Sequence, residues 1–153
     1  MRGDAEKEVV FALEFRGRAE PVDGSASRRR ARTMAPSQTL ATRLTADGVS
    51  ARVDVVAGDI AVLESRVERF ADGSFVEDGT IAYGAAGRIT FETIGRGWVA
   101  PGPRPGWVLG GVLWTVTGGE GRFAGARGLI TSNFTVSADG EVVDNHVARL
   151  YLP

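Results

Sequence analysis

Apolar and polar residues alternate in short runs along most of this chain. From Val9 to Phe15 every second residue is apolar, and later runs rich in Val, Ile, Thr, Phe and Trp repeat the pattern. Successive side chains of a β-strand point to opposite faces, so an alternation with a period of two predicts strands. We expect further strands over residues 40–44, 49–56, 60–70, 75–83, 87–94, 107–117, 129–136 and 141–152.

One of these runs also fits a helix. Leu63, Val67 and Phe70 would share a helical face between residues 61 and 70. No segment combines a sustained 3.6-residue period with capping residues, and the neighbouring strand-like runs favour a strand here too. We therefore expect an all-β protein.

Glycine-rich turns separate the expected strands. Asp-Gly pairs at 72–73 and 139–140 have the composition of hairpin turns, whereas the pair at 78–79 falls inside a run and indicates a bulge. Residues 118–128 form a corner with five glycines, and Phe123 within it is expected to plug one end of a barrel. Sequential antiparallel strands with short turns predict a single up-and-down β-barrel of about eight strands, with room inside for one small ligand.

The chain is expected to fold as one domain with two less regular segments. Its 153 residues suit a single barrel domain over 1–153. Residues 1–7 are expected to form a flexible N-terminus, and the polar segment 17–37 a long loop or lid. That segment carries an arginine run at 28–30 and Arg32, which are either solvated loop charges or a grip for a carboxylate, an enolate or a carrier protein.

The composition excludes several classes of function. The formal net charge is -1 and the pI is about 5.9, so no overall positive field attracts nucleic acid or an anionic membrane. The sequence has no cysteine and one histidine, which excludes thiolate chemistry and makes a zinc site uncommon. Neither a signal-peptide pattern nor a spanning apolar run is present, so we expect a cytoplasmic protein.

We expect neither a metal nor a cofactor. Gly119, Gly121 and Ala124 match the spacing of a dinucleotide-binding motif. That motif needs a helix directly after its glycines to bind pyrophosphate, and a strand-like run follows here. The match is therefore interpreted as part of the corner.

The same corner carries a family resemblance. The pattern Gly118-Gly-x-Gly-x-Phe-x-Gly-Ala-x-Gly128, between a strand rich in Trp, Val and Thr and a strand with Thr, Asn and Phe, resembles the late-barrel signature of the allene oxide cyclase and dirigent families. The resemblance spans residues 105–137 and implies a calycin-like eight-stranded barrel. It groups the chain with plant epoxide cyclases, dirigent proteins that guide radical coupling, and bacterial cyclases of polyketide intermediates, and we expect the bacterial natural-product branch.

The candidate site residues are polar and aromatic side chains on the expected strands. Glu92, Asn133 and His146 are the candidate catalytic residues, because each could polarise a carbonyl group or move a proton. Alternation places His146 on the same strand face as Asp144. Each candidate also has a structural interpretation, such as an outward glutamate or a buried core histidine. The candidate substrate-binding residues are Tyr83, Phe91, Trp98, Trp107, Trp114, Phe134 and Tyr151.

The strand expected at 107–117 is apolar on both faces. Trp114 lies on one face, and Leu109 and Leu113 lie on the other. One face would line the lumen, and the other would meet a partner or the proline-rich loop expected over 98–107 at the barrel mouth. We therefore expect a homo-oligomer, either a dimer or a trimer.

Together these features predict a cyclase or isomerase that needs no cofactor and takes a small hydrophobic molecule into the barrel lumen. It would fold a reactive polyene-like intermediate, expected to be a polyketide, for stereoselective ring closure while excluding water. Two alternatives stay open. One is a non-catalytic calycin-like carrier of a small apolar ligand, and the other is a dirigent-like auxiliary protein that steers coupling without chemistry of its own.

Overall fold

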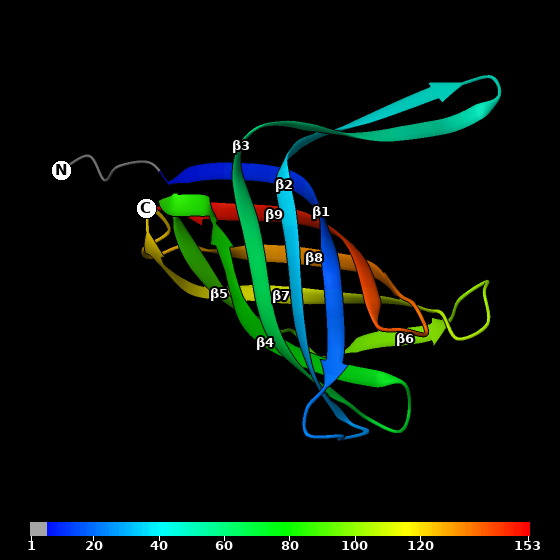
Figure 1. Cartoon of the computed structure of the whole chain (residues 1–153). Helices are drawn as coiled ribbons and strands as arrows, with labels where there is room; N and C mark the ends of the chain where they lie inside the picture. Colours follow the sequence, from blue (N-terminus) through cyan, green and yellow to red (C-terminus); the bar gives the residue numbers. More distant parts are fainter. Residues whose placement is uncertain (1–5) are drawn as a thin grey trace.

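The chain folds into one antiparallel sheet that closes on itself. The computed structural model describes residues 6–153. Its elements are β1 (Lys7–Pro21), β2 (Arg28–Thr45), β3 (Gly48–Arg69), β4 (Ser74–Tyr83), the 3-10 turn η1 (Gly84–Ala86), β5 (Gly87–Thr93), β6 (Gly97–Pro101), β7 (Val108–Gly121), β8 (Arg127–Val136) and β9 (Glu141–Leu152). The ring closes because β9 pairs with β1 and β4 pairs back with β3 (Figure 1). The predicted all-β barrel is confirmed, and the segment that also fitted a helix is part of β3.

Two of the strands share one position in the ring. Both β5 and β6 lie between β4 and β7, with β5 pairing the second half of β4 and β6 pairing its first residues, Ser74 and Phe75. The nine strands therefore make a ring of eight, as the sequence pattern predicted. Among residues 6–153, no helix has the length and apolar character needed to cross a membrane.

Alternate residues of each strand point into the ring and form the core. The largest fully buried side chains include Trp114, Phe15, Leu63, Ile81, Ile89, Ile130, Leu150 and His146. Burying one large apolar side chain stabilises a fold by roughly 1.5–3 kcal/mol. The strand face predicted to carry Asp144 and His146 is the inward face of β9, so this part of the alternation is confirmed.

The glycine-rich corner joins β7 to β8 and closes one end of the barrel. Phe123 packs against the core there, with its ring centroid 5.2 Å from that of Tyr83, as predicted for a plug. Gly128 has a φ of +148°, and a side-chain carbon at this position would overlap the carbonyl oxygen of Arg149 in β9. Glycine is therefore required here by close backbone approach.

Gly128→Val is expected to destabilise the protein by more than about 1 kcal/mol, because the new side chain meets backbone at a φ that L-residues avoid. Gly111→Ala is the control, since a Cβ there is 3.6 Å from its nearest neighbour, the Ser132 carbonyl oxygen. Urea unfolding of both variants measures the difference. Equal stability of Gly128→Val and the wild type would show that the corner tolerates side chains.

The segment predicted to be a loop or lid, residues 17–37, is mostly strand. β1 continues to Pro21 and β2 begins at Arg28, so only residues 22–27 form a turn. The alternation was hard to detect because the inward positions hold small or charged side chains such as Ala31 and Arg29, while further arginines occupy the outward ones. The lid interpretation is wrong, and most of the segment is barrel wall.

The dipeptide Asp78-Gly79 does not form the predicted bulge. Gly79 pairs in register with Ser65 of β3 and with Phe91 of β5. A side-chain carbon on Gly79 would overlap the carbonyl oxygen of Glu64. The glycine therefore serves the close approach of neighbouring strands, which is the other common reason for glycine within a strand.

Two other segments differ in extent from the prediction. Of the N-terminus expected over 1–7, residues 1–5 lie outside the described residues, and β1 already begins at Lys7. The proline-rich loop expected over 98–107 starts only after Pro101, because the residues before it form β6. A proline at the end of a strand removes little from the hydrogen-bond ladder.

A hairpin arm formed by β2 and β3 extends away from the barrel (Figure 1). The register of the two strands shifts between Pro36 and Gln38, and beyond this point they pair only with each other, out to Thr45 and Gly48. Nearly every residue of the arm is exposed. We call residues 38–55 the arm.

Candidate functional site

Polar side chains gather inside an otherwise apolar barrel. The buried polar and charged residues are Thr33, Ser65, Ser74, Glu77, Ser132, Asp144 and His146. Burying a polar group is costly unless it is hydrogen-bonded, and buried ionisable groups in a cavity often mark functional sites. Glu77 on β4 and Asp144 on β9 are carboxyl groups on opposite sides of the ring, four strands apart in either direction. They define the candidate site.

Asp144 is held in place by two neighbours. The Ser132 hydroxyl donates to its carboxylate, with Oγ 2.7 Å from Oδ1 and 2.9 Å from Oδ2. The Nε2–H of His146 donates to Oδ2 across 2.8 Å. The imidazole is itself fixed, since the Phe15 ring stacks on it at 4.3 Å and the Trp114 ring meets it edge-on at 5.1 Å. His146 is thus a positioning residue that orients Asp144.

Glu77 is the second carboxyl group and has a different protonation state. Burial raises the pKa of Glu77 to about 8; a hydrogen bond from the Ser65 hydroxyl, 2.6 Å from Oε1, opposes the rise, and the nearby charge of Asp144 adds to it. At pH 7 most of the Glu77 population is therefore protonated. The interior offers a carboxylic acid and a second carboxyl group facing the same space.

Raising the pH from 5 to 9 is expected to destabilise the protein through Glu77. Its folded pKa of about 8 lies above the ordinary value of 4.5, so between these values the folded state keeps a proton that the unfolded state has released. The free energy of unfolding then falls by up to about 1.4 kcal/mol per pH unit. Thermal unfolding should show this fall in the wild type and a smaller one in Glu77→Gln. Equal slopes in the two proteins would contradict a raised pKa.

The two carboxyl groups line a small cavity at the barrel end opposite the glycine corner. Its volume is about 50 Å³, which holds a few water molecules. Its walls are mainly apolar and its mouth is lined by two arginines; the lining residues are Ala19, Arg29, Ala31, Thr33, Leu63, Val67, Arg69, Phe75, Glu77, Val99, Phe134, Val136, Val142 and Asp144. A larger ligand can occupy this space only if the side chains at the mouth move outward.

The structure separates the three predicted catalytic residues. His146 is inside the barrel and reaches the cavity through Asp144. Glu92 and Asn133 are exposed on the outer surface, because both sit at the outward positions of their strands. Neither Glu92 nor Asn133 therefore faces the lumen in this structure, and a catalytic role for them stays a prediction.

Of the seven predicted substrate-binding residues, only Phe134 lines the cavity. Phe91 and Trp114 are fully packed core residues, with ring centroids 4.1 Å apart. Tyr83 lies at the closed end, where burial raises the pKa of its hydroxyl.

The other three predicted aromatic residues do not line the cavity. Trp98 is 56% exposed on β6, and the indole of Trp107 lies under the Arg104 guanidinium, 5.1 Å from it. Tyr151 is at an outward position of β9. The structure therefore places these three residues away from the cavity, and their contact with a ligand stays a prediction.

Sequence reasoning missed the residues that matter most. Glu77 interrupts an inward face that otherwise carries Phe75, Ile81 and Tyr83, and this single carboxyl group among aromatic and aliphatic side chains was a usable signal. Asp144 was placed on the correct face and not selected. Of the two arginines at the cavity mouth, Arg29 belongs to the run already considered as a grip for an anion, in a segment interpreted as a loop, whereas Arg69 at the end of the strand expected over 60–70 was not selected.

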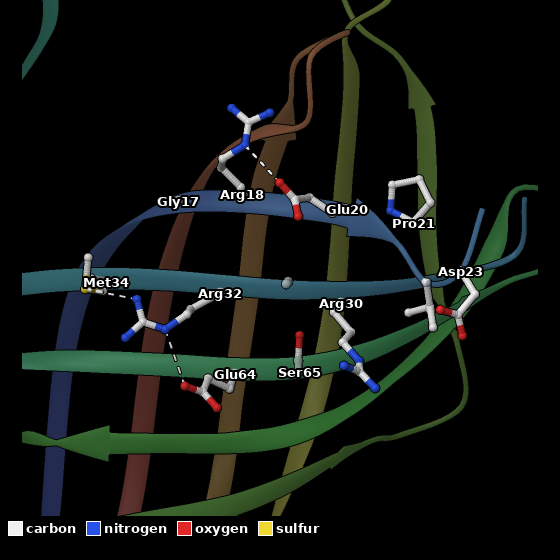
Figure 2. Close-up of a pocket in the computed structure, with 12 residues that line it drawn as sticks. Gly17, Arg18, Glu20, Pro21, Asp23, Arg30, Arg32, Met34, Glu64 and Ser65 are labelled. Atoms are coloured by element: carbon white, nitrogen blue, oxygen red, sulfur yellow. Dashed lines mark hydrogen bonds and ion pairs between the residues drawn. The ribbon is translucent and has the colours of Figure 1, made fainter. Parts of the chain in front are cut away.

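A hollow of about 770 Å³ lies on the outer surface over β1, β2 and β3 (Figure 2). Four of its charged side chains form ion pairs: Arg18 pairs with Glu20 and Arg32 with Glu64, both at 3.4 Å. All four are well exposed, so water screens these pairs. The outer hollow is a shallow trough in the barrel wall and lacks the buried acid groups of the interior.

Comparison with known proteins identifies the fold. No family model matches the sequence, and no curated protein matches it. A solved structure of a pterocarpan synthase dirigent protein is similar, with 13% sequence identity, a TM-score of 0.55, and coverage of 97% of this chain and 89% of that chain. A likeness at this identity concerns the fold alone. The chain is therefore a dirigent-like β-barrel.

Proposed function

We propose that the protein binds a small hydrophobic molecule in the barrel and directs its stereoselective isomerisation or ring closure by acid–base assistance. The observation that carries this proposal is the pair of buried carboxyl groups, Glu77 and Asp144, on opposite walls of one cavity. The apolar walls suit a polyene-like intermediate such as a polyketide chain. The dirigent-like fold agrees with a cavity that controls the shape of a reacting molecule.

The acid and the base have separate roles. The protonated Glu77 donates its proton to a carbonyl oxygen of the substrate as electrons move toward that oxygen. Asp144, held by Ser132 and His146, accepts a proton from a carbon or hydroxyl of the substrate. One proton enters and one leaves, so the product is an isomer of the substrate. A proton transfer from Asp144 back to Glu77 restores the starting state.

The barrel wall would supply shape and exclude water. Phe75, Phe134, Val136 and Val142 surround the carboxyl groups with apolar surface. A folded conformation that brings the reacting carbons together gains rate from orientation, and a dry site strengthens every charge interaction. Because the cavity is only about 50 Å³, binding requires the mouth to open.

A dirigent-like auxiliary role is the second candidate. It is favoured by the fold likeness to a dirigent protein, and it needs the cavity walls but no proton transfer. A simple carrier fits less well, because it would leave the two buried carboxyl groups, Glu77 and Asp144, without a role.

The experiment incubates the protein with a panel of linear conjugated polyenes that carry an α,β-unsaturated carbonyl group. Chiral chromatography measures the rate of cyclic product formation and the ratio of enantiomers. The proposed function predicts a faster reaction, an enriched enantiomer, and loss of rate in Asp144→Asn. If Asp144→Asn forms product at the full rate and still enriches one enantiomer, the auxiliary role is favoured. If the protein binds a polyene but neither accelerates the reaction nor enriches one enantiomer, a carrier is favoured.

A further inference from the structure

Two inward arginines stand at the mouth of the cavity. Arg29 on β2 and Arg69 on β3 both line it, at the same end as Glu77 and Asp144. Arg29 pairs in register with Val67, and Arg69 is two residues further along the same face of β3. Their side chains therefore project into the ring from adjacent strands. Neighbouring Arg28 and Arg30 are exposed, so one arginine of the run points inward.

The two inward arginines lack counter-charges. Among residues 6–153, neither guanidinium forms an ion pair, whereas the outward Arg18, Arg32 and Arg66 each do. The Nε of Arg29 is buried and has no hydrogen-bond partner within the described part of the chain. Partial burial lowers the pKa of Arg69, and the positive charge of Arg29 lowers it further.

Such an arrangement is unfavourable by itself. Two like charges are held together in a partly dehydrated place, and the buried Nε–H of Arg29 has no acceptor among the described residues. An anion between them would neutralise the repulsion and accept charge-assisted hydrogen bonds, for which guanidinium groups are well shaped. Below them the walls are apolar, formed by Val67, Phe134 and Val136 among others.

We propose that Arg29 and Arg69 bind an anionic head group of the substrate, a carboxylate or an enolate, at the cavity mouth. The apolar part of the substrate then extends down the cavity toward Glu77 and Asp144. This inference rests on the proposed function for the location of the reaction and adds the chemical class of the substrate: an amphipathic anion with a hydrophobic chain.

The test compares two fluorescent probes that differ by one anionic group. 1-Anilinonaphthalene-8-sulfonate carries a sulfonate, and N-phenyl-1-naphthylamine is the same skeleton without it. The wild type is expected to bind the sulfonate probe at least tenfold more tightly. Arg29→Gln and Arg69→Gln should each reduce this preference about tenfold, as expected for loss of a charge-assisted bond. Arg30→Gln, an outward neighbour on β2, should leave it unchanged.

Three results would overturn the anion site. The first is equal affinity of the wild type for both probes. The second is an equal loss of affinity for both probes in Arg29→Gln and Arg69→Gln. The third is a lower melting temperature of the probe-free inward variants, since removing an uncompensated charge should leave stability the same or higher. None of these results affects the acid–base proposal, which is tested by the Glu77 and Asp144 variants with neutral substrates.

The arm carries a second inference on independent grounds. Its two strands pair so that one face is apolar: Leu40, Leu44, Val49, Val53 and Val55 lie on it, while Arg43, Arg52 and Asp54 are on the other face. Leu44 is 77% exposed and Val49 is 70% exposed. A two-stranded hairpin alone in water is marginally stable, and a continuous exposed apolar face marks an interaction surface.

The same chain offers exposed apolar side chains on its outer wall. Val10 on β1, Leu129 on β8 and Val147 on β9 are 51%, 46% and 53% exposed on neighbouring strands. The exposed Arg149, which pairs with Glu8, lies between Val10 and Leu129 on this wall. The paired part of the arm is eight residues long, which at about 3.3 Å per residue gives roughly 26 Å. Because neighbouring strands lie about 4.8 Å apart, the two-stranded arm is about 10 Å wide, and each arm covers roughly 260 Å².

We infer that the apolar face of the arm docks on the β1–β9–β8 wall of a second copy of this chain, and that the docking is reciprocal. Two arms and two receiving walls then bury about 1,000 Å² in total, the size that a specific interface should reach. A reciprocal exchange covers the apolar face of each arm and the exposed apolar side chains of each receiving wall.

Sedimentation velocity tests the arm exchange. The wild type is expected to be oligomeric, and Leu44→Lys with Val49→Lys should shift it toward monomer, whereas Thr39→Lys with Thr45→Lys on the polar face should not. The chain has no cysteine, so Leu44→Cys combined with Val147→Cys should give an intermolecular disulfide on oxidation. A monomeric wild type, or an oligomer that survives the Leu44 and Val49 changes, would overturn the inference.

Discussion

Glu77→Gln is expected to lower the rate of the proposed isomerisation by about 10²–10⁴-fold, the usual contribution of a general acid. Glutamine keeps the size and polarity of the side chain but has no proton to donate. Because burial raises the pKa of Glu77 to about 8, the wild-type rate should fall as the pH rises through this value. Initial rates measured from pH 5 to 10 with a polyene substrate test both expectations.

The matched control for this variant is Glu92→Gln. Glu92 pairs across the strands with Asp78 and is exposed outside the barrel, so its loss should change the rate less than about twofold. Circular dichroism and thermal melting would verify that both variants are folded. A normal rate in Glu77→Gln, with its pH dependence unchanged, would exclude Glu77 as the acid and favour a cavity that acts through shape alone.

Trp114→Ala is expected to destabilise the fold by about 3–5 kcal/mol, a large part of the stability of a domain of this size. Trp114 is fully buried, stacks on Phe91 at a centroid distance of 4.1 Å, and supports the His146 imidazole from its edge. Its removal leaves a cavity in the middle of the ring. Urea unfolding monitored by far-UV circular dichroism, with linear extrapolation to zero denaturant, gives the change.

Trp98→Ala is the control for Trp114, since Trp98 is more than half exposed on the outside of β6. It should change the free energy of unfolding by less than about 0.5 kcal/mol. If Trp114→Ala were as stable as the wild type but failed to bind apolar probes, Trp114 would be a ligand contact as the sequence suggested, and the assignment to the packed core would be wrong.

The fold could be predicted from the sequence because its signals are local. Alternation with a period of two identified most of the strands, and the Asp-Gly pairs located two hairpins. On β9 the alternation also gave the correct inward face with Asp144 and His146. Where small or charged residues replaced the apolar ones, as between residues 17 and 37, the same rule failed.

The candidate site could be predicted only in part. Glu77 and Asp144 are 67 positions apart in sequence, and nothing local says that β4 and β9 face each other across a ring of eight strands. For an isolated strand, inward and outward are equivalent until the ring closes. This is why Glu92 and Asn133 were selected and Glu77 was not, although all three are polar residues on strands.

The sequence by itself determined that this chain is an all-β barrel with a glycine corner, because backbone preferences and alternation act over a few residues. Only the tertiary structure decided which carboxyl groups are buried, that burial raises the pKa of Glu77 to about 8, and that Arg29 and Arg69 face the cavity without an ion pair to any residue of 6–153. Ring closure also decided that no described residue of the same chain covers the apolar face of the arm. Burial and the electrostatic environment depend on residues brought together from distant strands, so these properties appear only when the whole barrel is assembled.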